Sequence, residues 1–202
     1  MALPDFRAPG GWYDAMAKEV KRVESFAAWR LVPISEYHKA RRDLGDDNAN
    51  VAYIVTAQTI KTDADGSLRS LGVANKFRIT LADKCHLTVD SIETYSCCVD
   101  DITNRLMTLL APMLGAEQTT IDISAAYFHG LPSLLRRLFS VVPWWLKFFG
   151  DYPERDAQGR RSLLEIVGNM PGRRDAGRIW QTRLDGFLLS YGMRQLITDR
   201  RV

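Results

Sequence analysis

The sequence predicts an α+β fold, and three observations support this prediction. Apolar residues recur with helical spacing near the start, in the middle and near the end of the chain. Strand-like runs lie between these stretches, and no internal repeat is present. A length of 202 residues, of which 46% are hydrophobic and 25% charged, suffices for a buried core. Helices and strands in this mixed order are typical of the α+β class.

The first half of the chain predicts a helix, a loop and a hairpin. The helix covers residues 11–26, with one apolar stripe formed by Trp12, Met16, Val20 and Val23. Residues 35–50 are polar and charged, and Asp46, Asp47, Asn48 and Asn50 within this stretch predict an exposed loop. Residues 51–62 have a strand pattern, followed by a turn at 63–67 and a second extended run at 75–81. Two such runs around a turn predict a β-hairpin.

The second half predicts further elements in alternation. Residues 100–114 have helical spacing, and a short strand is expected to begin at residue 119. A variable stretch with several prolines and tryptophans covers residues 131–161. A strand at residues 162–167 and a helix at 178–191 complete the expected elements.

Cysteine usage and hydropathy favour a reducing compartment and no membrane partner. The three cysteines are Cys85, Cys97 and Cys98, an odd number with an adjacent pair, so a disulfide framework is not expected. A zinc site that adds His86 is disfavoured, because its ligands would lack the usual spacing of two to four residues. The most apolar stretch, residues 138–149, is too short to span a bilayer, and no leader pattern opens the chain.

The positive charge is concentrated toward the C-terminus. The net charge is +3, and three arginines of one glycine-containing stretch are Arg173, Arg174 and Arg178. Such a cluster is typical either of a surface that faces phosphates or of a solvated charged face. Charge alone leaves both interpretations open.

Asp122 is the candidate catalytic residue. It lies in a stretch that is otherwise apolar, where a buried carboxylate without a partner would be costly. One interpretation is an ion pair with an arginine. The other is a ligand for a divalent metal ion in phosphoryl transfer, because hard oxygen donors suit Mg²⁺.

The string TIDISAAYFHG, residues 120–130, resembles the first catalytic motif of reverse transcriptases. The resemblance implies that the Asp122 carboxylate and the backbone carbonyl of Ile123 bind the metal, which is Mg²⁺ (or Mn²⁺) in that family. It implies that Tyr127 is the steric gate against a 2′-hydroxyl, supported by Phe128. A short motif of this kind is weak when it stands alone.

The flanking sequence is similar to the copia type of retrotransposon reverse transcriptase. WYDAM, WRLVP and KTDADGS near the start match that family's opening helix and fingers hairpin. ANKFRIT implies that Lys76 and Arg78 bind the nucleotide triphosphate. GNMPGRRDAGRIW implies that Gly172 and Arg174 contact the nucleotide, and that Arg173 and Arg178 contact nucleic acid. Two departures are Asp175, where the family has glutamine, and Gly177, where it has proline.

The resemblance implies a right-hand polymerase, with residues 1–118 as fingers and 119–202 as an incomplete palm that carries the variable insert 131–161. The implied activity is RNA-directed DNA polymerisation. No Tyr-x-Asp-Asp string, which supplies the other metal-binding carboxylates in the family, occurs in these residues. We therefore expect a chain truncated before the catalytic Asp-Asp hairpin and inactive alone; the alternative is a non-enzymatic nucleic-acid-binding or decayed remnant.

The implied partners are an RNA or DNA template-primer, deoxynucleoside triphosphates and the remainder of a Gag-Pol-like polyprotein. The implied location is the cytoplasm, within virus-like particles, and/or the nucleus. The sequence predicts no membrane association, for the reasons given above.

Overall fold

The computed structural model describes residues 11–46, 48–60, 75–83, 101–117, 122–132 and 136–194. The expected hairpin turn, the three cysteines and the first residues of the strand expected from residue 119 lie outside this part of the chain. The described elements are α1 (Trp12–Ser25), β1 (Trp29–Pro33), α2 (Ile34–Leu44), β2 (Ala49–Val51), β3 (Tyr53–Ile60), β4 (Asn75–Ala82), α3 (Asp101–Met113), η2 (Ala126–His129), β5 (Arg137–Val141), η3 (Leu146–Phe148), β6 (Ser162–Ile166) and α4 (Ala176–Ser190).

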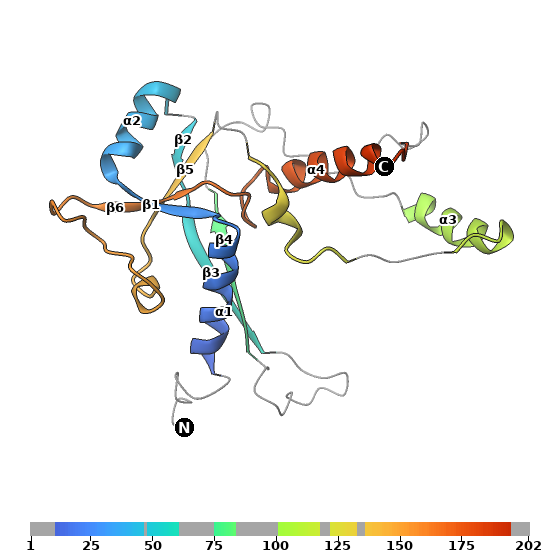
Figure 1. Ribbon diagram of the computed structural model, residues 1–202, viewed down its shortest axis with the longest axis horizontal. Helices are drawn as coiled ribbons and strands as arrows, with labels where there is room; N and C mark the ends of the chain where they lie inside the picture. Colours follow the sequence, from blue (N-terminus) through green and yellow to red (C-terminus); the bar gives the residue numbers. More distant parts are fainter. Residues whose placement is uncertain are drawn as a thin grey trace.

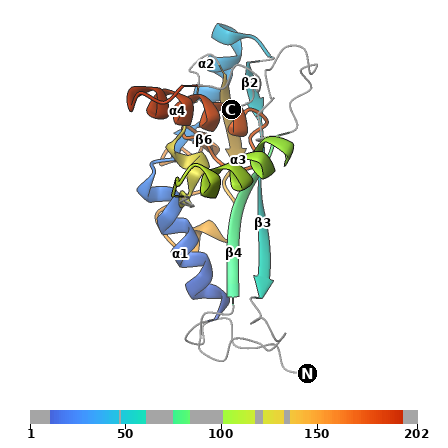
Figure 2. The same cartoon turned by 90° about the vertical axis from the view of Figure 1, so that its right-hand side faces the viewer.

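The strands form two sheets, and helices accompany them, which confirms the α+β class (Figure 1). One sheet has the strand order β1-β6-β5-β2, in which β6 is antiparallel to both of its neighbours and β2 is parallel to β5. The other is the expected hairpin of β3 and β4, paired in antiparallel register from Tyr53 with Ala82 to Ile60 with Asn75. Helix α1 lies along β4, as both Figure 1 and Figure 2 show.

The apolar stripe of α1 enters the main core, as the sequence predicted. Met16, Val20 and Val23 are buried there. The core joins them to buried side chains of β4, β5 and β6, among them Ile79, Leu138, Leu164 and Ile166. Helix α1 therefore closes one side of the hairpin and links it to the four-stranded sheet.

Backbone N–H groups on the open edge of β4 donate hydrogen bonds to acceptors from two other parts of the chain. The backbone N–H of Ile79 donates a hydrogen bond to Glu19 Oε1 at 3.1 Å, and that of Leu81 donates to the carbonyl of Pro171 at 2.8 Å. An unpaired strand edge would leave such donors exposed to other chains. These two bonds hold β4 against α1 and against the segment before α4.

The structure contains two elements that the sequence analysis did not identify. Much of the polar stretch 35–50 is helical, because α2 occupies Ile34–Leu44 and ends at Gly45 with a φ of 81°. In the expected loop Asp46 and Asn48 are exposed and lie outside any helix or strand, whereas Asn50 belongs to β2. Many side chains of α2 are charged, but the helix also has a narrow apolar face, on which Tyr37 and Ala40 pack against Phe139 and its neighbours. The variable stretch 131–161 contains a strand of the sheet, β5, in which Leu138, Phe139 and Ser140 are buried.

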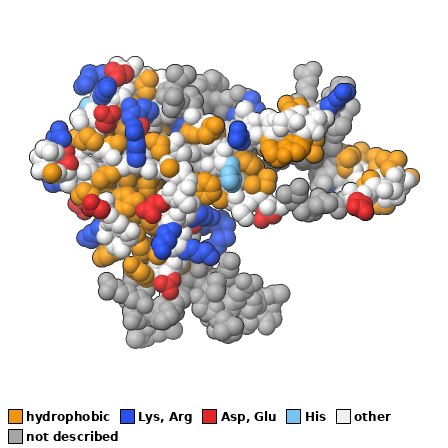
Figure 3. All heavy atoms as spheres, viewed as in Figure 1, with side chains coloured by type: hydrophobic (Ala, Val, Ile, Leu, Met, Phe, Trp, Pro, Cys, Tyr) orange, Lys and Arg blue, Asp and Glu red, His pale blue; other side chains and the backbone are white. Residues whose placement is uncertain are grey.

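Helix α3 matches the prediction for residues 100–114 within about one residue at each end. Its apolar side chains, however, are largely exposed, and Ala111 is the one buried side chain among those of α3 that are described. In Figure 3 apolar side chains gather on the arm formed by α4 and α3. The large apolar side chains of these two helices that are exposed are Ile102, Leu106, Met107, Leu109, Leu110, Met113, Phe187 and Leu189.

No helix in the described part of the chain is long and apolar enough to cross a membrane.

Candidate functional site

A cavity of about 260 Å³ lies where α1, β4 and η2 meet. Its lining includes Lys76 and Arg78 of β4 and Tyr127 of η2. The sequence predicted a nucleotide-binding role for each of these three residues, and the fold brings them to one place. The other lining residues are Arg22, Ile79, Thr80, Ala125, Ala126, Phe128 and Pro171.

The alternation of β4 places the two cations on one face of the strand. Phe77, Ile79 and Leu81 are buried in the core. Because successive side chains of a strand point to opposite faces, Lys76 and Arg78 lie on the other face of β4, and Ile79 also lines the cavity. Arg78 is exposed and Lys76 is partly buried.

Helix α1 adds a third cation, Arg22, that the sequence analysis did not identify. Its guanidinium donates a hydrogen bond to Glu19 Oε1 at 2.6 Å and lies over the ring of Phe128, 5.4 Å from the ring centroid. The spacing of three residues between Glu19 and Arg22 was the available signal, since such pairs meet on one helix face. The charged side chains among the described residues that line the cavity are all cationic.

The turn of η2 sets Tyr127 and Phe128 into different surroundings. Ala125, just before the turn, has a φ of 56°, in the left-handed region. Phe128 is buried and stacks on Phe26 with ring centroids 5.1 Å apart, whereas Tyr127 is 42% exposed. Figures 1 and 2 show this turn beside the C-terminal end of α1. A buried neighbour thus anchors the turn on which the candidate steric gate lies.

Gly130 ends this turn against the segment before α4. A Cβ at Gly130 would lie 2.6 Å from Nδ2 of the buried Asn169. That amide in turn donates a hydrogen bond to the carbonyl of Ala176 at 3.0 Å. The close contact explains a glycine at this position and fixes η2 relative to α4.

Asp122 and Ile123 lie away from the cavity lining. Both are exposed, and neither belongs to a strand, so the expectation of a strand at these two residues is wrong. Ile123 lines a separate apolar cavity of about 220 Å³ with Trp180, Leu184 and Phe187 of α4, and with His129 and Arg183. Within the described part of the chain, Asp122 therefore has neither the burial nor the arginine partner that the ion-pair interpretation required.

The described residues do not fit a site for two metal ions. They contain no group of three or more His, Cys, Asp or Glu side chains that could hold an ion. A pair of ions needs carboxylates from more than one position. Asp122, with one carboxylate beside the backbone carbonyl of Ile123, supplies too few oxygen ligands for such a pair.

The structure explains the glycine at position 172 by a contact within the fold, whereas the sequence led us to expect a contact with nucleotide or template. The φ of Gly172 is 86°, and a Cβ there would lie 2.0 Å from the carbonyl oxygen of Leu81. The glycine therefore allows the segment before α4 to pass directly against the backbone of β4. The neighbouring hydrogen bond between Leu81 and Pro171 depends on this approach.

Arg173 belongs to a buried ion-pair network. Its side chain is fully buried, and its Nε donates to Asp175 Oδ1 at 2.7 Å. Arg136, also buried, contacts Asp83 Oδ2 at 2.6 Å and Asp175 Oδ1 at 3.5 Å. The expected role of Arg173 in binding nucleic acid does not agree with this burial. Asp175, at the position where the copia family has glutamine, is the partner of Arg173.

Arg174 and Arg178 have different surroundings from Arg173. Arg174 is exposed, and its backbone N–H donates to Asp83 Oδ2 at 3.2 Å. Arg178 lies in the first turn of α4 and is partly buried. Of the clustered arginines, Arg174 is the most accessible to a polyanion.

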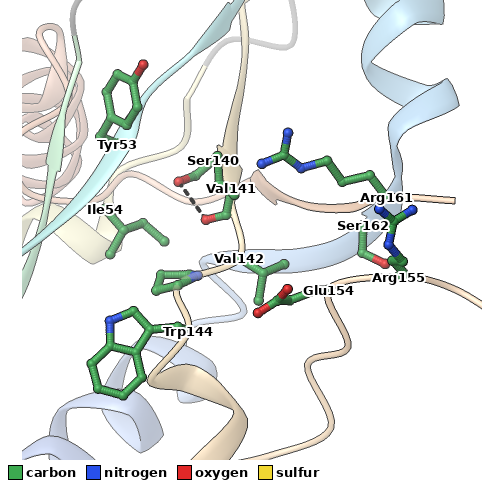
Figure 4. A pocket seen from close by; sticks show the side chains of 11 residues that line it. Tyr53, Ile54, Ser140, Val141, Val142, Trp144, Glu154, Arg155, Arg161 and Ser162 are labelled. Atoms are coloured by element: carbon green, nitrogen blue, oxygen red, sulfur yellow. Dashed lines mark hydrogen bonds between the residues drawn. The ribbon is translucent and has the colours of Figure 1, made fainter. Parts of the chain in front are cut away.

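Two larger cavities are both lined by Trp144, and neither is lined by a residue for which the sequence predicted a catalytic or binding role. One, of about 560 Å³, is drawn in Figure 4, where Tyr53 and Ile54 of β3 lie across from Arg155, Arg161 and Glu154. The other, of about 570 Å³, has a mainly aromatic lining that includes Tyr13, Phe77, Trp145 and Phe148. The first cavity therefore has a lining of both charged and apolar side chains, and the lining of the second is mainly apolar.

No protein-family model matches the chain, and neither a curated protein nor a solved structure matches it.

Proposed function

We propose that this chain is the fingers and the first part of the palm of a copia-type reverse transcriptase, an RNA-directed DNA polymerase. In this proposal the cavity between α1, β4 and η2 receives the incoming deoxynucleoside triphosphate. The observation that carries the proposal is the meeting of Lys76, Arg78 and Tyr127 in one cavity. The sequence motifs selected these residues from two separate segments.

The charge and size of the cavity suit the phosphate end of a nucleotide. Lysine and arginine side chains bind phosphate oxygens through charge-assisted hydrogen bonds. A cavity of about 260 Å³ is smaller than the roughly 300 to 1,000 Å³ typical of drug-sized ligands. It would therefore enclose the triphosphate, with the sugar near Tyr127 and the base outside.

The template-primer is proposed to approach the segment before α4. Arg174 and Arg178 would contact backbone phosphates there, and Gly172 would keep the segment close to β4. Arg173 holds this segment from inside through Asp175. The remainder of a Gag-Pol-like polyprotein, in cytoplasmic particles and/or the nucleus, completes the proposed setting.

The 202 residues by themselves are proposed not to polymerise DNA. They lack a Tyr-x-Asp-Asp string, and Asp122 is an exposed carboxylate that cannot hold two ions alone. Mg²⁺ or Mn²⁺ binding would require carboxylates beyond those that this part of the chain brings together. A primer-extension assay with these residues alone should yield no product, and robust Mg²⁺-dependent synthesis would contradict this part of the proposal.

The binding part of the proposal is tested by calorimetric titration with dTTP. We expect Lys76→Ala and Arg78→Ala each to weaken dTTP binding by about tenfold, because each removes a charge-assisted hydrogen bond. Lys18→Ala removes an equal charge from an exposed position of α1 outside the cavity lining and is the matched control. Equal effects of all three substitutions, or unchanged binding, would contradict a nucleotide site in this cavity.

A non-enzymatic, nucleic-acid-binding remnant of a retroelement is the second candidate. The exposure of Asp122 outside any strand favours it, because a catalytic carboxylate needs a fixed position. This candidate predicts salt-dependent binding of template-primer without any response to deoxynucleoside triphosphates. The dTTP titration separates the two candidates, and the genomic reading frame after the codon for Val202 tests for an in-frame Tyr-x-Asp-Asp segment.

A further inference from the structure

The mainly aromatic cavity of about 570 Å³ is lined by side chains from separate parts of the chain. Tyr13 and Met16 belong to α1, Phe77 to β4 and Phe148 to η3. Its volume lies within the roughly 300 to 1,000 Å³ typical of pockets for small organic ligands. It shares no described lining residue with the candidate nucleotide site, so its ligand is a separate question.

The face of the hairpin beside this cavity changes from apolar to polar along β3. Directly paired residues of an antiparallel hairpin lie on the same face. The pairs on this face are Ile54 with Leu81, Thr56 with Ile79, and Gln58 with Phe77. All three β4 members are buried and Ile54 packs against the core, so this is the core face of the hairpin. Polar side chains at Thr56 and Gln58 therefore need a reason other than packing in the core.

Thr56 and Gln58 offer uncharged hydrogen-bonding groups to the cavity. Thr56 is partly buried and Gln58 is exposed, and both line the cavity. Within the described part of the chain, neither side chain makes a hydrogen bond. A hydroxyl and a carboxamide together supply donors and acceptors without charge. One wall of an otherwise apolar cavity can thus recognise the polar edge of a ligand.

The aromatic side chains are held in position by contacts with one another. The hydroxyl of Tyr13 donates a hydrogen bond to the backbone carbonyl of Phe148 at 3.3 Å. Phe77 and Trp145 meet edge to face with ring centroids 5.9 Å apart, and Trp144 and Phe148 do so at 6.1 Å. Rings that are already fixed lose little conformational freedom when a ligand binds.

Two of these rings present open surface at the cavity. Trp144 is 66% exposed and Phe148 is 43% exposed. Exposed aromatic surface beside a cavity can stack on a flat ligand. Trp144 also lines the mixed cavity of Figure 4, where its ring lies on the side of Ile54, opposite Arg155 and Arg161.

The charge of the surroundings restricts the ligand further. The described lining residues carry no charge, so an ion in the cavity would lose its hydration without gaining a counter-ion. The ammonium of Lys147 lies over the ring of Phe148, 5.7 Å from its centroid, and would repel a cation. A purely aliphatic ligand would cover Thr56 and Gln58 without satisfying them. A flat ring with hydrogen-bonding groups on its edge meets all of these conditions.

We propose that this cavity binds a flat, uncharged heteroaromatic molecule with fused rings. The ligand stacks on Trp144 and Phe148, and its polar edge forms hydrogen bonds with Thr56 and Gln58. The inference goes beyond the proposed function, because it concerns a separate cavity and requires neither nucleotide nor nucleic acid.

The ligand class is tested by ligand-observed NMR titration of the whole chain, with quinazolinone as the probe. Quinazolinone is a neutral fused-ring lactam, and we expect a dissociation constant of about 1 mM or below. Naphthalene has the same ring shape without a polar edge and should bind at least about fivefold more weakly. Equal affinity for naphthalene, or absence of quinazolinone binding, overturns the proposal.

Two further probes test other ligands that aromatic cavities accept. Tetramethylammonium would reveal a cage for a cation, and decaproline would reveal a groove for a proline-rich peptide. We expect both to bind more weakly than quinazolinone. Tighter binding of either one would contradict the assigned ligand class.

Substitutions locate the probe. Trp144→Ala removes the stacking surface, and Gln58→Met removes hydrogen bonds at nearly constant length, so each should weaken quinazolinone binding by about fivefold. Tyr191→Ala removes an aromatic side chain that is 73% exposed and lies outside the cavity lining, so it should have no effect. Arg161→Ala alters the mixed cavity alone and should also leave binding unchanged.

The results of these substitutions support or overturn the proposal. Thermal unfolding of each variant checks that it is folded, and Gln58→Met decides the question if Trp144→Ala is not. Unchanged quinazolinone binding in the folded variants overturns the proposal. Binding weakened by Arg161→Ala would place the probe in the mixed cavity and would overturn it as well. The dTTP titration involves none of these residues, so its outcome bears on the proposed function alone.

Discussion

The carboxylate of Glu19 accepts the backbone N–H of Ile79 at 3.1 Å while it also holds Arg22 at 2.6 Å. A buried acid on α1 therefore completes the edge of the strand that carries Lys76 and Arg78. Both the stability of the hairpin edge and the position of Arg22 in the candidate site therefore depend on the side chain of Glu19.

Replacement of Glu19 should separate its two roles. Glu19→Gln keeps an oxygen that can accept the Ile79 N–H but leaves Arg22 without a counter-ion, and should cost about 1 to 2 kcal/mol of unfolding free energy. Glu19→Ala loses both contacts and leaves the buried backbone donor without a partner, so it should cost about 3 kcal/mol. Urea unfolding measures both values, and equal losses would show that the strand-edge bond contributes nothing.

Gly172→Ala should be strongly destabilising. The Cβ would meet the Leu81 carbonyl at 2.0 Å, and alanine is disfavoured at a φ of 86°. We expect a loss of about 2 to 4 kcal/mol in urea unfolding. Gly192→Ala is the matched control, because Gly192 has a φ of 81° with nothing within 4 Å of its Cβ position. It should lose only about 1 kcal/mol, and similar losses at both glycines would exclude the steric explanation.

Adjacent arginines should behave differently when each is replaced by alanine. Arg173→Ala removes the buried partner of Asp175 and should lower the unfolding free energy by about 3 kcal/mol. Arg174→Ala changes an exposed side chain and should alter stability by less than about 0.5 kcal/mol. It should instead weaken template-primer binding and lower the salt slope by about one unit. A salt slope unchanged in Arg174→Ala would argue against a phosphate contact there.

Acid should destabilise the four-stranded sheet through Glu165. Burial by itself would raise the pKa of this carboxyl, but hydrogen bonds from Arg137 and Arg30 outweigh burial and hold the pKa below its ordinary value of 4.5. A depressed pKa gives stability that is present above pH 4.5 and is lost as the pH falls through the lower value in the folded protein. Urea unfolding measured from about pH 6 down to about pH 3 should show this loss of unfolding free energy.

Glu165→Gln provides the control for that titration. The variant should be less stable than the original chain at pH 6, and the gap should narrow as acid protonates Glu165. A gap that stays constant with pH would assign the acid response to other carboxylates.

The apolar side chains of α3 should promote self-association. Leu106 and Leu109 are 52% and 66% exposed, and larger exposed apolar patches are prone to associate. Light scattering should detect association that rises with concentration, and Leu106→Glu or Leu109→Glu, each made alone, should reduce it. Asn104→Glu adds the same kind of charge at an exposed polar position of the helix and should have a smaller effect. Equal effects would indicate that net charge, and not the apolar face, governs association.

The sequence by itself determined the elements whose periodicity is strong. The stripe on α1, the hairpin of β3 and β4, and helix α3 follow from local spacing of apolar residues, which depends only on the geometry of one element. It also identified Lys76, Arg78 and Tyr127 as a group, because these residues match short motifs. The sequence did not predict helix α2, because its apolar face is narrow. It did not predict strand β5, because the apolar residues of β5 run into a stretch without a clear period.

Only the tertiary structure decided which side chains serve the cavity and which serve the core. Arg173 and Arg174 are neighbours of one chemistry, yet one pairs with Asp175 inside and the other faces solvent. Arg22 joins the cavity only because β4 and η2, which are distant from α1 in the sequence, pack beside the end of that helix. The physical reason is that burial and pairing depend on contacts between segments far apart in the chain, and local patterns carry no information about those contacts.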